Sequence, residues 1–249
     1  MNHEKDTIYS TPMDPVPPFT FDDRVARVFP DMIKRSVPGY ADIIDMIGLF
    51  ARHYVQHGSN CYDLGASLGA ATLAMRRNIN VDGVTIHAVD NSADMLKRCG
   101  ENIQWDQSRT QVELLLGDVE DIQMTDASMV VLNFTLQFIP AKRRQRIVDR
   151  IFKALRPGGV CIISEKLVFP QREGQQEVLT HMHLDFKRMQ GYSDLEISQK
   201  RQSLENVLVS NSSDEIIGMF DNAGFSRSFQ WFQYLSFASF FAAKATTHA

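Results

Sequence analysis

The sequence predicts an α/β fold built on a mostly parallel sheet, because short apolar runs alternate with segments of helical periodicity. Continuous apolar runs are typical of parallel strands, since the crossover helices bury both faces of the sheet. A length of 249 residues, with 44% hydrophobic and 22% charged, fits one large domain with a core and excludes a wholly disordered chain. The runs span residues 61–64, 84–90, 112–117, 129–134 and 160–164.

Two helices are predicted before the first strand. Clustered prolines favour an extended arm over residues 1–20, without a fold of its own. Apolar residues at helical spacing then predict one helix from Phe21 up to Pro30 and a second over residues 43–54. Everything from residue 21 to 249 is expected to form a single α/β domain.

The C-terminal third interrupts the alternation and then completes the sheet. The segment 155–159, Leu-Arg-Pro-Gly-Gly, predicts a helix end before the fifth strand. Residues from about 170 to 210 are polar and helix-prone, which predicts an inserted helical cap. A helix near 214–222 and two aromatic strands, 225–234 and 236–243, follow.

Composition narrows the function classes. A net charge of -4 argues against a broad basic face for nucleic acid, so a small-molecule partner is the better hypothesis. Cys61, Cys99 and Cys161 are far apart and odd in number, which predicts neither a zinc site nor a disulfide framework. We expect a cytoplasmic protein, because no signal-like apolar segment or membrane-length run occurs.

The strongest local signal is the run Asp63-Leu64-Gly65-Ala66-Ser67-Leu68-Gly69, which ends the first strand and opens a helix. Glycines at these positions let the backbone approach a ligand closely. Ser67 stands where a dinucleotide-binding loop often has its second glycine, so a pyrophosphate cradle is less favoured. A plain tight turn between strand and helix is the alternative.

Polar residues also end the next three strands. Asp90-Asn91 follows the second strand, and an acid there can accept both ribose hydroxyls of an adenosine. Asp118, in Gly117-Asp118-Val119, is placed to accept from an adenine amine, and Asn133 ends the fourth strand. Each has a structural alternative: a helix N-cap for Asp90 and turn residues for the others. Four coincidences at successive strand ends favour one ligand site.

Three further sequence patterns are explained best by ordinary structural roles. His181 and His183 are two apart on a helix, so we expect solvent-facing or locally bonded side chains and no metal site. The basic run 142–146, with Arg150, is expected to be a solvated helix face, with RNA contact as the minority alternative. The aromatic stripe 229–241 is expected in the sheet core or a dimer contact.

The constellation of strand-end residues resembles the class I S-adenosylmethionine-binding methyltransferase fold. That resemblance implies a Rossmann-like, seven-stranded, mostly parallel sheet whose last strand is antiparallel, and the two terminal aromatic strands fit it. Four stretches are more specific and resemble the carboxy-S-adenosyl-L-methionine synthase family from about residue 7 to residue 244. They are FDDRVARVFPDMIKRSVPGY, YDLGASLGAATLAMRRNI, SMVVLNFTLQF and GYSDLEISQKRQSLENV.

The resemblance implies an enzyme that converts S-adenosyl-L-methionine and prephenate to carboxy-S-adenosyl-L-methionine and phenylpyruvate, without a metal. It also implies a homodimer, and a product used by a tRNA carboxymethyltransferase at the wobble uridine. Arg201 would be both a ligand contact and the catalytic residue. The other implied ligand contacts are Tyr40, Gly65, Ala66, Ser67, Asp90, Asn91, Asp118, Val119 and Asn133.

The assignment of Tyr40 and Arg201 as ligand contacts rests on the resemblance alone. Ala66 replaces a cysteine typical of the family, and a backbone contact there would survive the change. An arginine beside the sulfonium of an ordinary methyl donor would repel it, whereas a new carboxylate there would attract the guanidinium fork. The implied mechanism is deprotonation of the sulfonium methyl to a ylide that captures carbon dioxide from prephenate.

Two other functions stay open on the residues themselves. One is a conventional methyltransferase acting on tRNA or on a small molecule, which would yield S-adenosylhomocysteine. The other is a nucleoside-binding regulatory module without turnover. The proton acceptor for the methyl group is not identified, since a base on the substrate is as plausible as a protein side chain.

Overall fold

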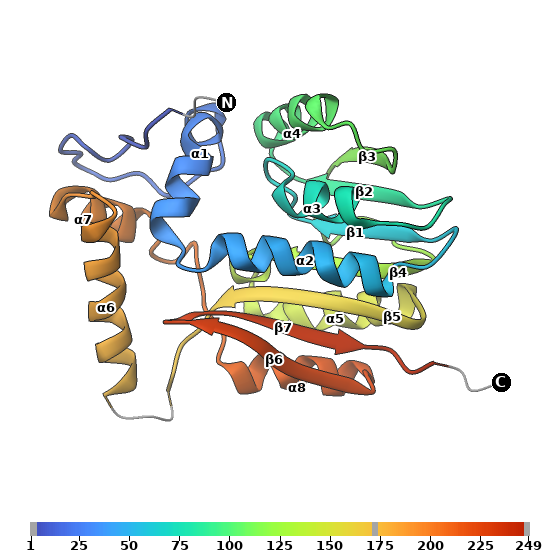
Figure 1. Cartoon of the computed structure of the whole chain (residues 1–249). Helices are drawn as coiled ribbons and strands as arrows, with labels where there is room; N and C mark the ends of the chain where they lie inside the picture. Colours follow the sequence, from blue (N-terminus) through green and yellow to red (C-terminus); the bar gives the residue numbers. More distant parts are fainter. Residues whose placement is uncertain (1–3, 171–173, 247–249) are drawn as a thin grey trace.

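A seven-stranded sheet forms the centre of the computed structural model, which describes residues 4–170 and 174–246 (Figure 1). Its strand order is β3-β2-β1-β4-β5-β7-β6; neighbours from β3 to β5 pair in parallel, and β7 is antiparallel to both β5 and β6. The predicted fold class is therefore confirmed. The strands are β1 (Asn60–Leu64), β2 (Thr85–Asp90), β3 (Gln111–Leu116), β4 (Ala127–Asn133), β5 (Leu155–Lys166), β6 (Arg227–Tyr234) and β7 (Phe237–Ala243).

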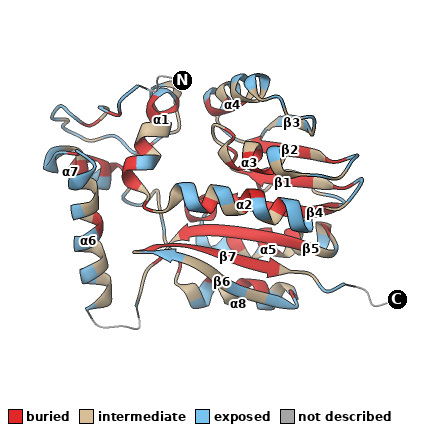
Figure 2. Cartoon of the chain, viewed as in Figure 1, coloured by how far each residue is buried: buried red, intermediate tan, exposed pale blue. Residues whose placement is uncertain are grey.

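Helices cover both faces of the sheet. Along β4 the side chains alternate: Met129 and Val131 pack toward α2 and α3, while Val130 and Leu132 pack toward α5 and α8. The central strands are buried accordingly (Figure 2). The helices are α1 (Asp23–Ser36), α2 (Tyr40–Tyr54), α3 (Ala70–Asn78), α4 (Ala93–Trp105), α5 (Ala141–Ala154), α6 (Gln175–Met189), α7 (Asp194–Ser203) and α8 (Ser213–Ala223), with a 3-10 turn η1 (Leu136–Phe138).

Two predicted boundaries were wrong. Helix α1 continues through Pro30 to Ser36, because Val28 before the proline and Met32 after it pack in the same apolar cluster and compensate for the lost hydrogen bond. Helix α5 ends at Ala154 as predicted, but β5 begins at once with Leu155 rather than at residue 160. The register between β4 and β5 shifts after Leu155, so the Pro-Gly-Gly segment lies within the strand as an irregularity.

The N-terminal arm and the cap pack on each other, to one side of the sheet. Residues 4–22 contain no helix or strand. The buried side chain of Gln199 on α7 forms hydrogen bonds with the backbone of this segment. The Gln199 amide nitrogen donates to the carbonyls of Tyr9 and Thr11, both at 2.9 Å, and its oxygen accepts from Met13 N at 2.6 Å. Helices α6 and α7 form the cap, next to α1 (Figure 1).

Arg144 corrects the predicted solvated face of α5. Lys142 and Arg146 are exposed, but Arg144 is 1% exposed. Its guanidinium donates to the carbonyls of Ile139 and Val209, both at 2.8 Å, and to the side chain of Asn211. These acceptors replace water as hydrogen-bond partners of the charged group. Arg144 therefore links α5 to the segment after the cap that contains Val209 and Asn211.

No helix in the described part of the chain is both long and apolar enough to span a bilayer.

We predict that Arg144→Ala lowers the free energy of unfolding by about 3 to 5 kcal/mol, because it leaves several buried acceptors without a donor. Urea denaturation followed by circular dichroism measures this. Arg146→Ala, on the exposed face of the same helix, should change stability by less than about 0.5 kcal/mol. Equal, small effects of both substitutions would contradict the role assigned to Arg144.

Candidate functional site

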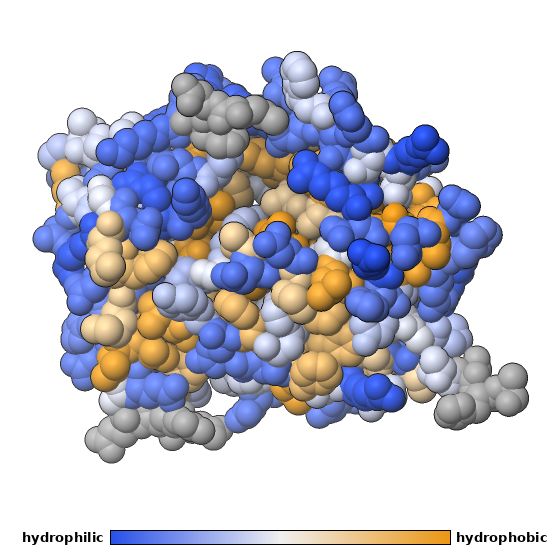
Figure 3. All heavy atoms as spheres, viewed as in Figure 1, coloured by the Kyte–Doolittle hydropathy of each residue, from blue (hydrophilic) through white to orange (hydrophobic). Residues whose placement is uncertain are grey.

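A cavity of about 390 Å³ opens at the carboxyl ends of β1, β2 and β4, between the sheet, α1 and the cap. Figure 3 shows the molecular surface on this side, with apolar residues in the hollow between the α1 region and the sheet. The site lies where the strand order reverses, between β1 and β4, which is the usual ligand position in open parallel sheets. Of the predicted contacts, those that line it are Tyr40, Gly65, Ala66, Ser67, Asp90, Asn91, Asp118, Val119 and Asn133.

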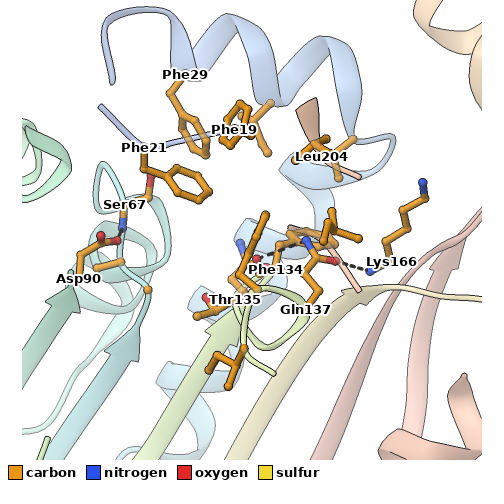
Figure 4. A pocket seen from close by; sticks show the side chains of 18 of the residues that line it. Phe19, Phe21, Phe29, Ser67, Asp90, Phe134, Thr135, Gln137, Lys166 and Leu204 are labelled. Carbon is orange, nitrogen blue, oxygen red and sulfur yellow. Dashed lines mark hydrogen bonds between the residues drawn. The ribbon is translucent and has the colours of Figure 1, made fainter. Parts of the chain in front are cut away.

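The glycine loop is shaped by close contacts. Gly65 has φ +84°, and a Cβ there would lie 2.6 Å from Thr135 Cγ2 and closer still to its hydroxyl oxygen. Only glycine fits this left-handed conformation and this spacing. The amides of Gly65 and Ala66 both donate to the Val89 carbonyl at 2.8 Å, which ties the loop to the end of β2. The loop is therefore more than a plain turn, since it forms one wall of the cavity (Figure 4).

Asp90 organises the wall formed by β2. Its carboxylate accepts from Ser67 N at 2.8 Å and Ser92 N at 2.9 Å, and burial raises its pKa despite these bonds. The alternative of an N-cap is wrong, because Ser92 caps α4 by accepting from Met95 N. Asp90 thus joins the glycine loop to the second strand end and faces the cavity (Figure 4).

The third and fourth strand ends lie on either side of this wall. Asn91 donates to Asp118 Oδ1 at 2.9 Å, which brings the ends of β2 and β3 together. Asn133 ends β4, and its buried Oδ1 accepts no hydrogen bond from any described residue. Tyr40 stacks on Phe134 with ring centroids 6.2 Å apart, and burial raises the pKa of its phenol. An unpaired buried acceptor on the cavity wall fits a ligand donor.

Asp63 is a cavity residue that the sequence placed in the glycine motif but not among the ligand contacts. Its Oδ2 accepts from the backbone and hydroxyl of Thr72 at 2.8 and 2.6 Å, while its buried Oδ1 has no partner in the described structure. Burial, partly offset by these two bonds, raises the pKa of Asp63 to about 6. The free oxygen is a second acceptor suited to a cationic ligand group.

Aromatic side chains from the N-terminal segment cover the cavity, which sequence patterns did not indicate. Phe19, Phe21 and Phe29 line it, and Phe21 packs edge-on against Phe19 and Phe138 with centroids 5.1 and 5.3 Å apart (Figure 4). The backbone amide of Phe19 donates to the Ser203 carbonyl at the end of α7. The Ser92 hydroxyl at the start of α4 donates to the Phe21 carbonyl, so both the cap and α4 hold this segment against the cavity.

The prediction for His183 was wrong, whereas His181 is exposed as expected. His183 is buried in the cavity wall, where its Nε2 donates to the distant Ser36 carbonyl at 2.8 Å and its ring packs edge-on against Phe237. Burial lowers its pKa to about 3, and the charge of Lys187 acts in the same direction. No group of three or more potential metal ligands occurs among the described residues.

Arg201 lies differently from the other predicted contacts. Its side chain is exposed on α7 and is not part of the cavity wall, while the adjacent Lys200 is. Burial lowers the pKa of Lys166 on the wall, and the charge of Arg201 lowers it further. Arg201 is therefore close enough to act electrostatically on this end of the cavity.

We predict that Gly65→Ala lowers the free energy of unfolding by about 1 to 3 kcal/mol through backbone strain and the clash with Thr135. It should also weaken binding of S-adenosylmethionine, the expected ligand, about tenfold. Calorimetric titration and urea denaturation measure the two effects. Gly218→Ala is the matched control, since a Cβ there meets no atom within 4 Å, and it should leave binding unchanged. Unchanged affinity in Gly65→Ala would contradict the role of the loop.

Comparisons with known proteins agree with this geometry. A family model described as a methyltransferase domain matches residues 62–159. The carboxy-S-adenosyl-L-methionine synthase of Aliivibrio fischeri (strain MJ11) is 51% identical over 96% of this chain and 98% of its own length. The enzyme of that name from Escherichia coli (strain K12) is also 51% identical, over 98% of each chain. Among solved structures, an O-methyltransferase family protein from Burkholderia thailandensis has a TM-score of 0.65 at 16% identity, over 91% of this chain and 61% of that one.

Proposed function

The chain belongs to the carboxy-S-adenosyl-L-methionine synthase family, and we propose that it converts S-adenosyl-L-methionine and prephenate to carboxy-S-adenosyl-L-methionine and phenylpyruvate. Identity of 51% over nearly the whole length is the observation that carries the proposal, because it includes the arm and the cap as well as the common sheet. The likeness to an O-methyltransferase is confined to the fold.

The acidic end of the cavity suits S-adenosylmethionine, which carries a sulfonium and an ammonium group. Asp90 would accept from the ribose hydroxyls and Asp118 from the adenine amine, as expected at these strand ends. The unpaired oxygens of Asp63 and Asn133 lie further along the wall, where they can accept from the ammonium group. In this proposal the acids bind and orient the substrate and take no part in bond formation.

The proposed reaction is balanced by the two substrates alone. Prephenate loses carbon dioxide and hydroxide as its ring becomes aromatic, and the sulfonium methyl loses one proton. A carbon–carbon bond then forms between that methyl carbon and carbon dioxide, while the proton and the hydroxide leave as water. His183 is a poor candidate base, since burial lowers its pKa to about 3. The aromatic side chains that cover the cavity, Phe19, Phe21 and Phe29, would limit escape of carbon dioxide before capture.

Arg201 is proposed to stabilise the carboxylate as it forms on the methyl carbon. Its guanidinium offers a planar fork that can bind a carboxylate through two hydrogen bonds. Its position beside the wall formed by Lys166 and Lys200 supports this role, although a movement of its exposed side chain would be needed for contact.

The wider setting is part of the same proposal. We place the enzyme in the cytoplasm as a homodimer whose product is used by a tRNA carboxymethyltransferase at the wobble uridine. The half-exposed Phe229 and Tyr234 on edge strand β6 are suited to a contact between subunits.

We predict that incubation with S-adenosylmethionine and prephenate yields a compound heavier than S-adenosylmethionine by the mass of carbon dioxide, together with an equal amount of phenylpyruvate. Mass spectrometry of the released small molecules measures both, and a reaction without prephenate is the control. Formation of S-adenosylhomocysteine without this compound would point to a conventional methyltransferase. Retention of unchanged S-adenosylmethionine would point to a binding module.

We predict that Arg201→Ala weakens the carboxylated product by about 2 kcal/mol, the lower end of the range for truncating one member of a charge pair, since the side chain is exposed. Binding of S-adenosylmethionine should be nearly unchanged. Calorimetric titration with each compound measures the difference, and Arg201→Lys, which keeps charge but loses the fork, should give an intermediate loss. An equal loss for both compounds would contradict the assignment.

A further inference from the structure

Charge is largely segregated along the cavity, since Arg143, the lining cation at its acidic end, is paired with Glu120 at 2.8 Å. Its acidic wall residues, Asp63, Asp90, Asp118 and Glu120, belong to the ends of β1, β2 and β3 or to the segments that follow them. The lysines of the wall lie at the other end, on three separate elements: Lys166 ends β5, Lys187 is on α6 and Lys200 is on α7. We infer that these three lysines form a binding site for the two carboxylates of the co-substrate. The inference rests on the proposed function and assigns its second substrate a place.

The lysines are poorly neutralised by the protein. Among described residues, the ammonium groups of Lys166 and Lys187 make no hydrogen bond or ion pair that meets ordinary distance criteria. Lys200 Nζ is 3.2 Å from the Ser36 hydroxyl and 3.8 Å from the buried Asp6, which is not part of the cavity wall. Lys200 is thus partly neutralised by its ion pair with Asp6, whereas Lys166 and Lys187 have no described carboxylate partner, so the wall at this end keeps a positive field.

The pKa values of Lys187 and Lys200 lie below the ordinary value for lysine. Burial lowers the pKa of Lys187 to about 7, and the charges of Lys200 and Lys166, then of Arg201, act in the same direction. Burial also lowers the pKa of Lys200 to about 8, partly offset by Asp6. The buried His183 beside them is neutral and adds no charge. An anion among these groups would raise their pKa values and remove the mutual repulsion.

The chemistry of the ligand follows from the count of charges. S-adenosylmethionine has a single carboxylate and two cationic groups, so it suits the acidic end of the cavity. Prephenate has two carboxylates and no cation, and two or three lysines can bind both. The aromatic residues Phe134 and Phe237 line the wall between the two ends, where they can pack against its six-membered ring.

Binding experiments test this without turnover, with S-adenosylhomocysteine bound in place of S-adenosylmethionine because it lacks the reacting methyl group. Lys166→Met and Lys187→Met should each weaken prephenate binding about 10- to 100-fold, as expected for a lost charged hydrogen bond. Their affinity for S-adenosylmethionine should change less than about threefold. Lys187→Arg keeps the charge and should retain most of the prephenate affinity, and the exposed Lys97→Met is the matched control.

Dependence on pH gives a second readout. Prephenate affinity of the wild type should fall as pH rises through the pKa values of Lys187 and Lys200, about 7 and about 8, because neutral lysines no longer attract an anion. Lys187→Arg should flatten this fall, since its guanidinium does not titrate there. The groups that face Lys187 are Lys166, His183, Lys200 and Arg201. Those that face Lys200 include Asp6, Arg35 and Asp31.

Three outcomes would overturn the inference. One is prephenate affinity that is unchanged in both methionine variants. Another is a parallel loss of S-adenosylmethionine affinity, which would mean that the lysines bind the carboxylate of that molecule. The third is wild-type protein that binds no prephenate at all. A wild type that binds prephenate through these lysines but forms no carboxylated product would instead overturn the proposed function and leave the anion site standing.

Discussion

The site depends on the close approach of two strand ends, at Gly65 after β1 and Thr135 after β4. The two strands are neighbours in the sheet, but their chains turn to opposite faces, and this divergence opens the cavity. Because Gly65 has no side chain, Thr135 can occupy the space beside it, and the loop can turn at positive φ toward Val89. Asp90 then accepts from Ser67 and fixes the far side of the loop. The positions of the ends of β1, β2 and β4 therefore depend on one another.

The strand-end residues were predictable because they depend on local order along the chain. Apolar runs identify buried parallel strands, and parallel strands bring their carboxyl ends to one edge of the sheet, so Asp90, Asp118 and Asn133 had to be near Gly65. Seven strands and an antiparallel β7 also agree with the resemblance. These features require no knowledge of side-chain contacts between distant segments.

Other features could not be predicted for the same physical reason. The burial of Arg144 depends on Val209 and Asn211, which lie more than sixty residues later and supply its acceptors. His183 is buried in a position where the Ser36 carbonyl, 147 residues earlier, accepts its ring N–H, and this burial lowers its pKa. A basic run or a pair of histidines looks solvated in sequence, since periodicity shows which face a residue occupies but not what covers that face. Pro30 was wrongly predicted to end the first helix, because tertiary packing on both sides of the proline outweighed its local effect as a helix breaker.

The division of charge in the cavity explains how a fold associated with methyl transfer can instead accept a carboxyl group. A cationic sulfonium and an anionic co-substrate have to meet, and a single uniform field would repel one of them. Acids at β1 to β3 and lysines at β5, α6 and α7 provide a separate field for each, while the walls between them contain apolar aromatic residues. Lys187 and Lys200 lie on the cap, which packs against the arm through Gln199 and against α1 through Ser36, a contact of both His183 and Lys200. In the proposed second substrate site, elaborations outside the common sheet therefore supply two of the three lysines, and β5 supplies the third.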